Sequence, residues 1–102
     1  MSNSSTDRQA NLAADTLTRE PRRYNVLLHN DNYTSMDFVV EVLVSIFSKN
    51  ATEATAIMLV VHEKGSCVCG IYTREVAETK LAQVRQKARQ AGFPLRCTME
   101  EA

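Results

Sequence analysis

Several residue types are scarce or absent in this chain, and each absence narrows the possible classes of protein. The chain has 102 residues, with no tryptophan, three cysteines, three glycines and a formal net charge of zero. An odd number of cysteines without a secretion signal indicates a reducing compartment and no disulfide framework. None of the glycines lies in a glycine-rich loop, which excludes a phosphate-binding loop. The balanced charge provides no overall field to hold nucleic acid or an anionic membrane.

Long apolar runs are also missing. The longest, residues 56–61, is far shorter than the ~20 residues that span a bilayer. The first residues have no apolar signal segment, and Asp7, Asp15 and Glu20 are atypical of a transit peptide. With 44% hydrophobic residues, the chain is predicted to be one small soluble domain in the cytoplasm.

The composition changes near residue 20. Residues 1–20 contain no aromatic residue, no valine and no isoleucine. Such a segment buries too little apolar surface to offset the entropy lost on ordering. We expect a mobile N-terminal extension there and a folded domain over residues 21–102.

Periodicity predicts the first elements of this domain. A period of two through Val26 and Leu28 predicts a buried strand, which the polar residues 30–32 end. Thr34 followed by Asp37 has the form of a capping box and predicts a helix start. The apolar stripe of that helix is expected to comprise Met36, Val39, Val40, Leu43 and Phe47.

The next two elements follow from a second start signal. Asn50 and Glu53 repeat the capping-box pattern, and glycine is typical of a helix end, so a helix is predicted between Asn50 and Gly65. The uncharged, β-rich residues 67–72 then predict a buried strand.

The last third of the chain predicts a helix and a strand. Apolar residues advance by three and four between Thr73 and Gly92, which indicates an amphipathic helix. Residues 95–99 alternate apolar and polar side chains, as in a half-exposed strand. The order is β-α-α-β-α-β. Because three strands need a cover for their apolar face, we predict a two-layer α+β domain with three helices on a three-stranded sheet.

Groups suited to catalysis or metal binding are few. Cys67 and Cys69 are the candidate nucleophiles. They would need His62 as a base and Asp31 to orient it, but a thiol within an apolar strand is unreactive. Neither the three cysteines nor the set of His29, Asp31 and His62 has the spacing of a known metal site. We therefore expect no enzyme activity, no metal and no cofactor.

One basic stretch offers a possible surface for RNA or an acidic protein. No acid interrupts it, and its five basic residues are Lys80, Arg85, Lys87, Arg89 and Arg96. A ribosome- or RNA-associated module that uses this face is the rival function, and it predicts strongly salt-dependent binding. The alternative is an ordinary solvated helix face.

A further cluster combines polar and apolar side chains. Asn30, Asp31 and Asn32 offer acceptors in the loop that follows the first strand. Met58 and His62 are four residues apart on the second predicted helix, so they share one face. Polar acceptors beside an apolar wall suit a ligand with one cationic and one apolar end. The alternative is a histidine and a methionine that only pack in the core.

The chain resembles the ClpS adaptor family. The resemblance is carried by YNVLLHNDNYTSMDFVVEVL, MLVVHEKG, VCGIYTREVAETK and GFPLRCTMEEA, and it runs from about Pro21 to Ala102. It implies a β-α-α-β-α-β fold like that of the C-terminal domain of the ribosomal stalk protein. It also implies a bacterial adaptor that is not an enzyme. Such adaptors bind substrates whose first residue is Leu, Phe, Tyr or Trp and hand them to the ClpA unfoldase of the ClpAP protease.

The same resemblance implies roles for particular residues. Asn30 and His62 would bind the substrate α-amino group, and Asp31 would add negative character. The neighbouring position, Asn32, is implied to belong to the same amine-binding group. The residues implied to line a hydrophobic pocket are Thr34, Met36, Val39, Met58, Val61 and Leu95. Met36 would be a gate whose bulk excludes the β-branched residues Ile and Val.

The implied partners are N-degron peptides and the N-terminal domain of a ClpA-type unfoldase. The unfoldase-facing residues would be Glu75 and Lys80, residues 1–20 would serve delivery, and a monomer is expected, with no nucleic acid or membrane bound. Two positions depart from the family pattern. Asn32 stands where most members carry a second acid, which lowers the charge near the amine. Ser35 stands in place of a proline, which removes a fixed φ angle.

Overall fold

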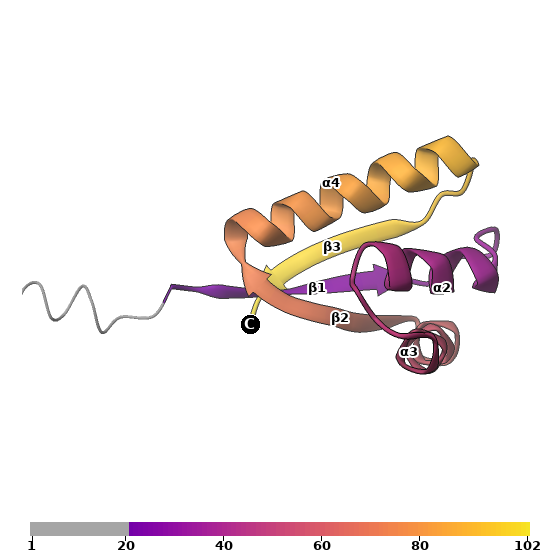
Figure 1. Cartoon of the computed structure of the whole chain (residues 1–102), viewed down its shortest axis with the longest axis horizontal. Helices are drawn as coiled ribbons and strands as arrows, with labels where there is room; N and C mark the ends of the chain where they lie inside the picture. Colours follow the sequence, from indigo (N-terminus) through magenta and orange to yellow (C-terminus); the bar gives the residue numbers. More distant parts are fainter. Residues whose placement is uncertain (1–20) are drawn as a thin grey trace, which may run out of the picture.

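The computed structural model describes residues 21–102, and the expected extension at residues 1–20 lies outside the described residues. Six elements follow one another along the chain, as Figure 1 shows. They are β1 (Arg23–His29), α2 (Met36–Ser45), α3 (Ala51–Lys64), β2 (Ser66–Thr73), α4 (Arg74–Ala91) and β3 (Arg96–Glu101). The predicted β-α-α-β-α-β order and the α+β class are confirmed.

The strands form one antiparallel sheet in the order β2-β1-β3, with β1 in the centre. Strand β2 is therefore an edge strand, and the prediction that it is buried is wrong. Its Val68 and Ile71 are 40% and 53% exposed. Residues opposite one another on paired strands share a face of the sheet, and Val68 lies opposite Leu27. These side chains belong to the face that the helices leave uncovered.

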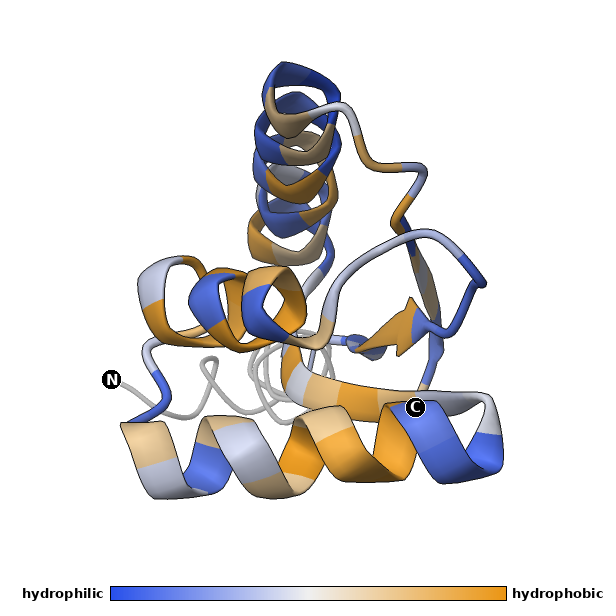
Figure 2. Cartoon of the chain, turned by 90° about the vertical axis from the view of Figure 1, so that its right-hand side faces the viewer, coloured by the Kyte–Doolittle hydropathy of each residue, from blue (hydrophilic) through white to orange (hydrophobic). Residues whose placement is uncertain are grey.

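The other face of the sheet forms the core with the helices (Figure 2). Val26 and Leu28 of β1 have no exposed surface. Helix α4 contacts all three strands, whereas α2 and α3 pack against each other. The rings of Phe38 on α2 and Phe93 after α4 have centroids 4.8 Å apart, so an aromatic contact joins the start of α2 to the end of α4.

Caps and glycines set the ends of α3 and α4. The side chain of Asn50 accepts from the N–H of Glu53 at 2.8 Å, and the Glu53 carboxylate accepts from the N–H of Asn50 at 3.1 Å. The predicted capping box is therefore present. Gly65 and Gly92 have φ angles of 96° and 82°, a left-handed conformation that glycine adopts without strain. None of the helices described over residues 21–102 combines the length and apolar character that crossing a membrane requires.

The start of α2 differs from the sequence expectation. The N-cap is Ser35, whose Oγ accepts from the N–H of Phe38 at 3.1 Å. Thr34 does not cap the helix because its hydroxyl donates to Asp31, and a charged acceptor makes the stronger hydrogen bond. Met36, which was expected on the apolar stripe, is 44% exposed, while Phe38 is buried.

Candidate functional site

One carboxylate orders the loop between β1 and α2. Asp31 Oδ1 accepts the N–H groups of Tyr33 at 2.8 Å and Thr34 at 2.7 Å. Its Oδ2 accepts the Thr34 hydroxyl at 2.7 Å, and together these bonds close a compact Asx turn. The N–H of Asn30 donates to the carbonyl of Gly65 at 2.8 Å. That bond fixes the start of the loop beside the end of α3.

The same hydrogen bonds set the charge of the loop. Partial burial raises the pKa of the Asp31 carboxyl, but the bonds from Thr34 and Tyr33 outweigh burial and hold that pKa below its ordinary value. Asp31 is therefore ionised at neutral pH. Both carboxylate oxygens of Asp31 already accept hydrogen bonds from donors within the loop. Asp31 therefore stabilises the conformation of the loop.

Helices α2 and α3 supply the facing wall. Met36 is the first residue of α2, and Val39 follows three positions later. Met58, Val61 and His62 are spaced by three and four residues on α3, so they share one side of that helix. Because α2 and α3 pack against each other, the two sets meet. Met36 and His62 are exposed, whereas Val39 and Val61 are buried.

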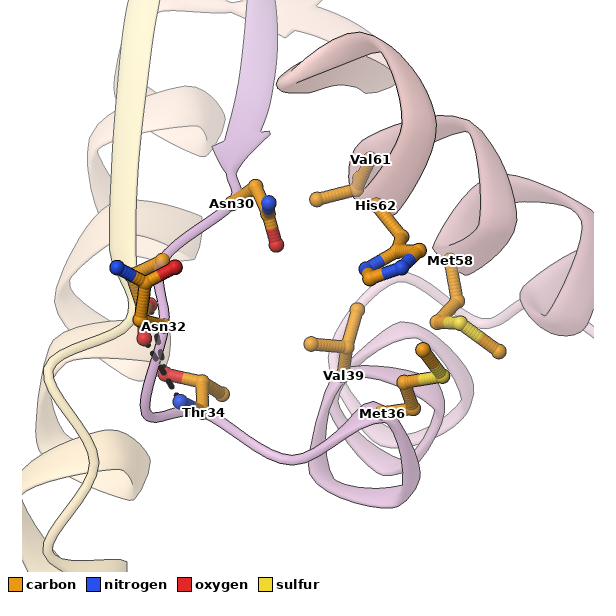
Figure 3. Close-up of a pocket in the computed structure, with 9 residues that line it drawn as sticks. Asn30, Asn32, Thr34, Met36, Val39, Met58, Val61 and His62 are labelled. Atoms are coloured by element: carbon orange, nitrogen blue, oxygen red, sulfur yellow. Dashed lines mark hydrogen bonds between the residues drawn. The ribbon is translucent and has the colours of Figure 1, made fainter.

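The loop and the two helices enclose a pocket of about 240 Å³. It is lined by Asn30, Asp31, Asn32, Thr34, Met36, Val39, Met58, Val61 and His62. Figure 3 shows the side chains of Asn30 and His62 on opposite sides of the opening, with the valines and methionines along the helical side. The volume is below the ~300–1,000 Å³ of pockets for drug-sized ligands, and it suits one large amino-acid side chain.

The pocket brings together most of the residues singled out from the sequence. All four residues expected at the amine, and five of the six expected in the hydrophobic wall, line it. Leu95 is the exception, because it is not among the residues that line this pocket. It is 7% exposed and lines a separate hollow with Leu81 and Arg85, because it lies between α4 and β3 and packs there. Its position near the C-terminus gave no local signal of this placement.

The two residues implied to face an unfoldase lie on α4 and have different surroundings. Glu75 is exposed in the first turn of α4, beside the start of β1, whereas the pocket lies beyond the end of β1. Lys80 is half-buried. Its Nζ donates to the carbonyl of Ile46 at 2.7 Å and lies 5.6 Å from the ring centroid of Tyr72. Lys80 therefore satisfies a carbonyl at the C-terminal end of α2, a role that the sequence did not reveal.

The basic stretch on α4 is only partly a free surface. Lys80 is engaged by Ile46, and Lys87 Nζ lies 3.0 Å from Glu41 Oε2. The exposed members of the stretch are Arg85, Arg89 and Arg96. Among the described residues, no contact favours a nucleic-acid surface over a solvated helix face.

The cysteines are poor nucleophiles. Burial raises the pKa of the Cys69 thiol to about 12, with further contributions from the neighbouring cysteines, and burial raises that of Cys97 to about 12. Burial also raises the pKa of the Cys67 thiol. Thiols of this kind are protonated at neutral pH and react slowly. Over residues 21–102, no three histidine, cysteine or acidic side chains lie close enough together to hold a metal ion.

Fold and site together define a class of protein. A small α+β domain with a pocket that combines apolar and polar side chains is typical of a binding domain. The family model described as ATP-dependent Clp protease adaptor protein ClpS matches residues 19–98. The chain belongs to the ClpS family and is an adaptor of a Clp protease.

Individual relatives agree with the family match. The ATP-dependent Clp protease adapter protein ClpS of Oleidesulfovibrio alaskensis is 61% identical over 97 residues, which is 95% of this chain and 93% of the relative. The protein of the same name from Syntrophus aciditrophicus is 55% identical over 95 residues, which is 93% of this chain and 89% of the relative. The structure of Agrobacterium tumefaciens ClpS2 bound to L-phenylalaninamide has a TM-score of 0.79 at 36% identity. The match covers 81% of this chain and 100% of the ClpS2 chain.

Proposed function

We propose that this adaptor binds the free α-amino group and the bulky hydrophobic first residue of N-degron substrates, namely Leu, Phe, Tyr or Trp, and delivers them to a ClpA-type unfoldase. The observation that carries the proposal is the pocket of about 240 Å³, which has an apolar wall and polar side chains at its opening. A blocked or internal residue would present no ammonium group to the polar side chains.

The polar rim matches the chemistry of an N-terminus. A free α-amino group has a pKa of about 7.7–8.0, so near pH 7 it is mostly an ammonium with three N–H donors. The amide oxygen of Asn30 and an unprotonated imidazole nitrogen of His62 are acceptors for two of them. The Asp31 carboxylate adds negative charge within the same loop. Asn32 contributes an amide where a second acid would add more charge.

The apolar wall matches the first side chain. Thr34 contributes its methyl group, because its hydroxyl is already bonded to Asp31. Val39 and Val61 form the buried part of the wall, and Met36 stands at the exposed rim as the gate. Burial of a Leu or Phe side chain contributes about 1.5–3 kcal/mol, which is too little for tight binding without the contacts to the amine.

The solved relative supports this assignment. Agrobacterium tumefaciens ClpS2, which shares the fold at a TM-score of 0.79, is bound to L-phenylalaninamide. That ligand combines a free α-amino group with an aromatic side chain, the two features that this pocket would recognise. The ClpA-type unfoldase and its proposed contacts, Glu75 and Lys80, rest on the family resemblance, as does a monomeric state.

Fluorescence anisotropy with three labelled peptides tests the proposal. They begin with free Phe, with N-acetylated Phe and with free Ile, and are otherwise identical. We expect only the free Phe peptide to bind tightly. His62→Ala should lose that binding, whereas Glu63→Ala, its exposed neighbour on α3, should retain it. Equal binding of the free and acetylated peptides would reject recognition of the amine.

A further inference from the structure

The sulfur-containing side chains of the described residues are of two chemical kinds, the thiols of cysteine and the thioethers of methionine. The three cysteines lie on the strands, and Cys69 has almost no exposed surface. Burial raises the pKa of all three thiols, and for Cys69 and Cys97 it reaches about 12. Because oxidants react with the thiolate, these cysteines are poor targets at neutral pH.

The methionines have no such protection. A thioether has no proton to lose, so access to the sulfur decides how fast it is oxidised. Met36 is 44% exposed at the start of α2, and Met58 is half-buried on α3. Both line the pocket, and Figure 3 shows their thioether ends on the same side of it, below His62. Met99, by contrast, is half-buried on β3, packs against the core and is not among the pocket residues.

We propose that Met36 and Met58 form a redox-sensitive modification site, at which oxidation to methionine sulfoxide by a hydroperoxide closes the pocket to hydrophobic first residues. This inference rests on the proposed function. The hydroperoxide transfers one oxygen atom to the thioether sulfur, so that an S–O bond forms, the O–O bond breaks, and the second oxygen leaves as water or an alcohol. The sulfur loses two electrons and the peroxide gains them.

The sulfoxide changes the wall that meets the substrate. It replaces a soft apolar group with a strong hydrogen-bond acceptor that is hydrated in the empty pocket. A Leu or Phe side chain displaces that water and offers no donor in return, so the oxygen is buried without a partner. In the proposed binding mode the substrate ammonium is directed to Asn30 and His62, and the first side chain is the part that meets this wall. Sulfoxide reductases reverse the change, so the closure is reversible.

The test uses the full chain treated with hydrogen peroxide, with oxidation of each methionine followed by peptide mass spectrometry. Affinity for the free Phe peptide is measured before and after treatment. We expect Met36 and Met58 to gain one oxygen each and the affinity to fall about tenfold or more. Treatment with the two sulfoxide reductases should restore it.

Two variants locate the effect. Leucine has nearly the volume of methionine and no sulfur. The affinity of the double variant Met36→Leu/Met58→Leu should therefore be the same before and after peroxide treatment. Met99→Leu, outside the pocket, should lose affinity as the native chain does. The proposal is overturned if the native chain binds equally well with both pocket methionines oxidised, or if the double leucine variant loses as much affinity as the native chain. Failure of the untreated, folded chain to bind the free Phe peptide would instead reject the proposed function, and this inference with it.

Discussion

Met36 is the side chain that we propose sets specificity, and it contributes little to the core. It is 44% exposed at the rim of the pocket and is not part of the buried core. We expect Met36→Ala to bind peptides that begin with Ile or Val. The variant lacks the long Met36 side chain, which would collide with the branch at Cβ of these residues. Anisotropy titrations should show about a tenfold or greater gain in affinity for these peptides, at little cost in stability.

The control for this variant is Leu59→Ala. Leu59 is also 44% exposed, lies on α3 and does not line the pocket. It should leave the discrimination between Phe and Ile unchanged. A Met36→Ala variant that rejects Ile and Val as strongly as the native chain would remove Met36 from the gate.

His29 links stability to pH. Its ring is 2.7 Å from the Thr98 hydroxyl, and burial, together with the charge of Arg96, lowers its pKa, while Glu100 opposes the shift. The folded state therefore favours the neutral ring more than the unfolded state does. The resulting stabilisation is complete above the unfolded pKa of about 6.5 and is lost as the pH falls through the lowered value.

Urea unfolding of the native chain and of His29→Gln between pH 5 and 7.5 checks this sign. The free energy of unfolding of the native chain should fall toward pH 5 more steeply than that of the variant. Parallel pH dependences of the two proteins would contradict the assignment to His29.

At the scale of elements, Ser35 determines how α2 begins. Its Oγ accepts from the N–H of Phe38, and its φ of −72° lies within the range that proline permits. The serine thus supplies a cap bond where a proline would supply a fixed φ. We expect Ser35→Ala to lower the free energy of unfolding by about 1 kcal/mol, because one helix N–H loses its acceptor.

Ser35→Pro separates the two effects. It also lacks the cap bond, but it restricts the unfolded chain, so it should be about 0.4–1 kcal/mol more stable than the alanine variant. Urea unfolding of the three proteins measures both differences. If Ser35→Ala matched the native chain, the cap would contribute nothing to stability.

A second element-scale prediction concerns the contact between α4 and α2. Lys80 donates to the Ile46 carbonyl and lies over the Tyr72 ring. Lys80→Met should lower the free energy of unfolding by about 1–3 kcal/mol, because the carbonyl loses a charged donor and the ring loses its cation. Arg85→Met, an exposed cation on the same helix, should cost much less in the same denaturation experiment. Equal losses for the two variants would indicate that the Ile46 contact is not specific.

At the scale of the whole molecule, the proposed sites of recognition and delivery lie at opposite ends of the domain. The pocket follows the end of β1, whereas Glu75 and the connection to residues 1–20 lie at its start. Deletion of residues 2–16 should therefore leave peptide affinity unchanged and slow the degradation of an N-degron protein by ClpAP. Replacement of the same residues by an equally long Gly/Ser sequence tests whether length alone is sufficient. Loss of peptide affinity in the deletion would place these residues in the binding site instead.

The helices, the strands and most of the pocket residues could be predicted from the amino-acid sequence. The capping box at Asn50 and Glu53 and the left-handed glycines at the ends of α3 and α4 depend on bonds between near neighbours, which residue identity specifies. The pocket residues could be predicted because they fall in two short segments. One is a polar loop with the helix turn that follows it, and the other is one face of the next helix.

Where several partners compete for one group, the partner that it takes became known from the folded structure. Thr34 bonds Asp31 and leaves Ser35 to cap α2, and Lys80 reaches Ile46, which is 34 residues away. The edge position of β2 and the packing of Leu95 between α4 and β3 also depend on how the sheet is assembled. The positions of Lys80, β2 and Leu95 depend on contacts between segments distant in sequence, which no local pattern contains. At the start of α2 two local patterns compete, and neither pattern alone says which one forms.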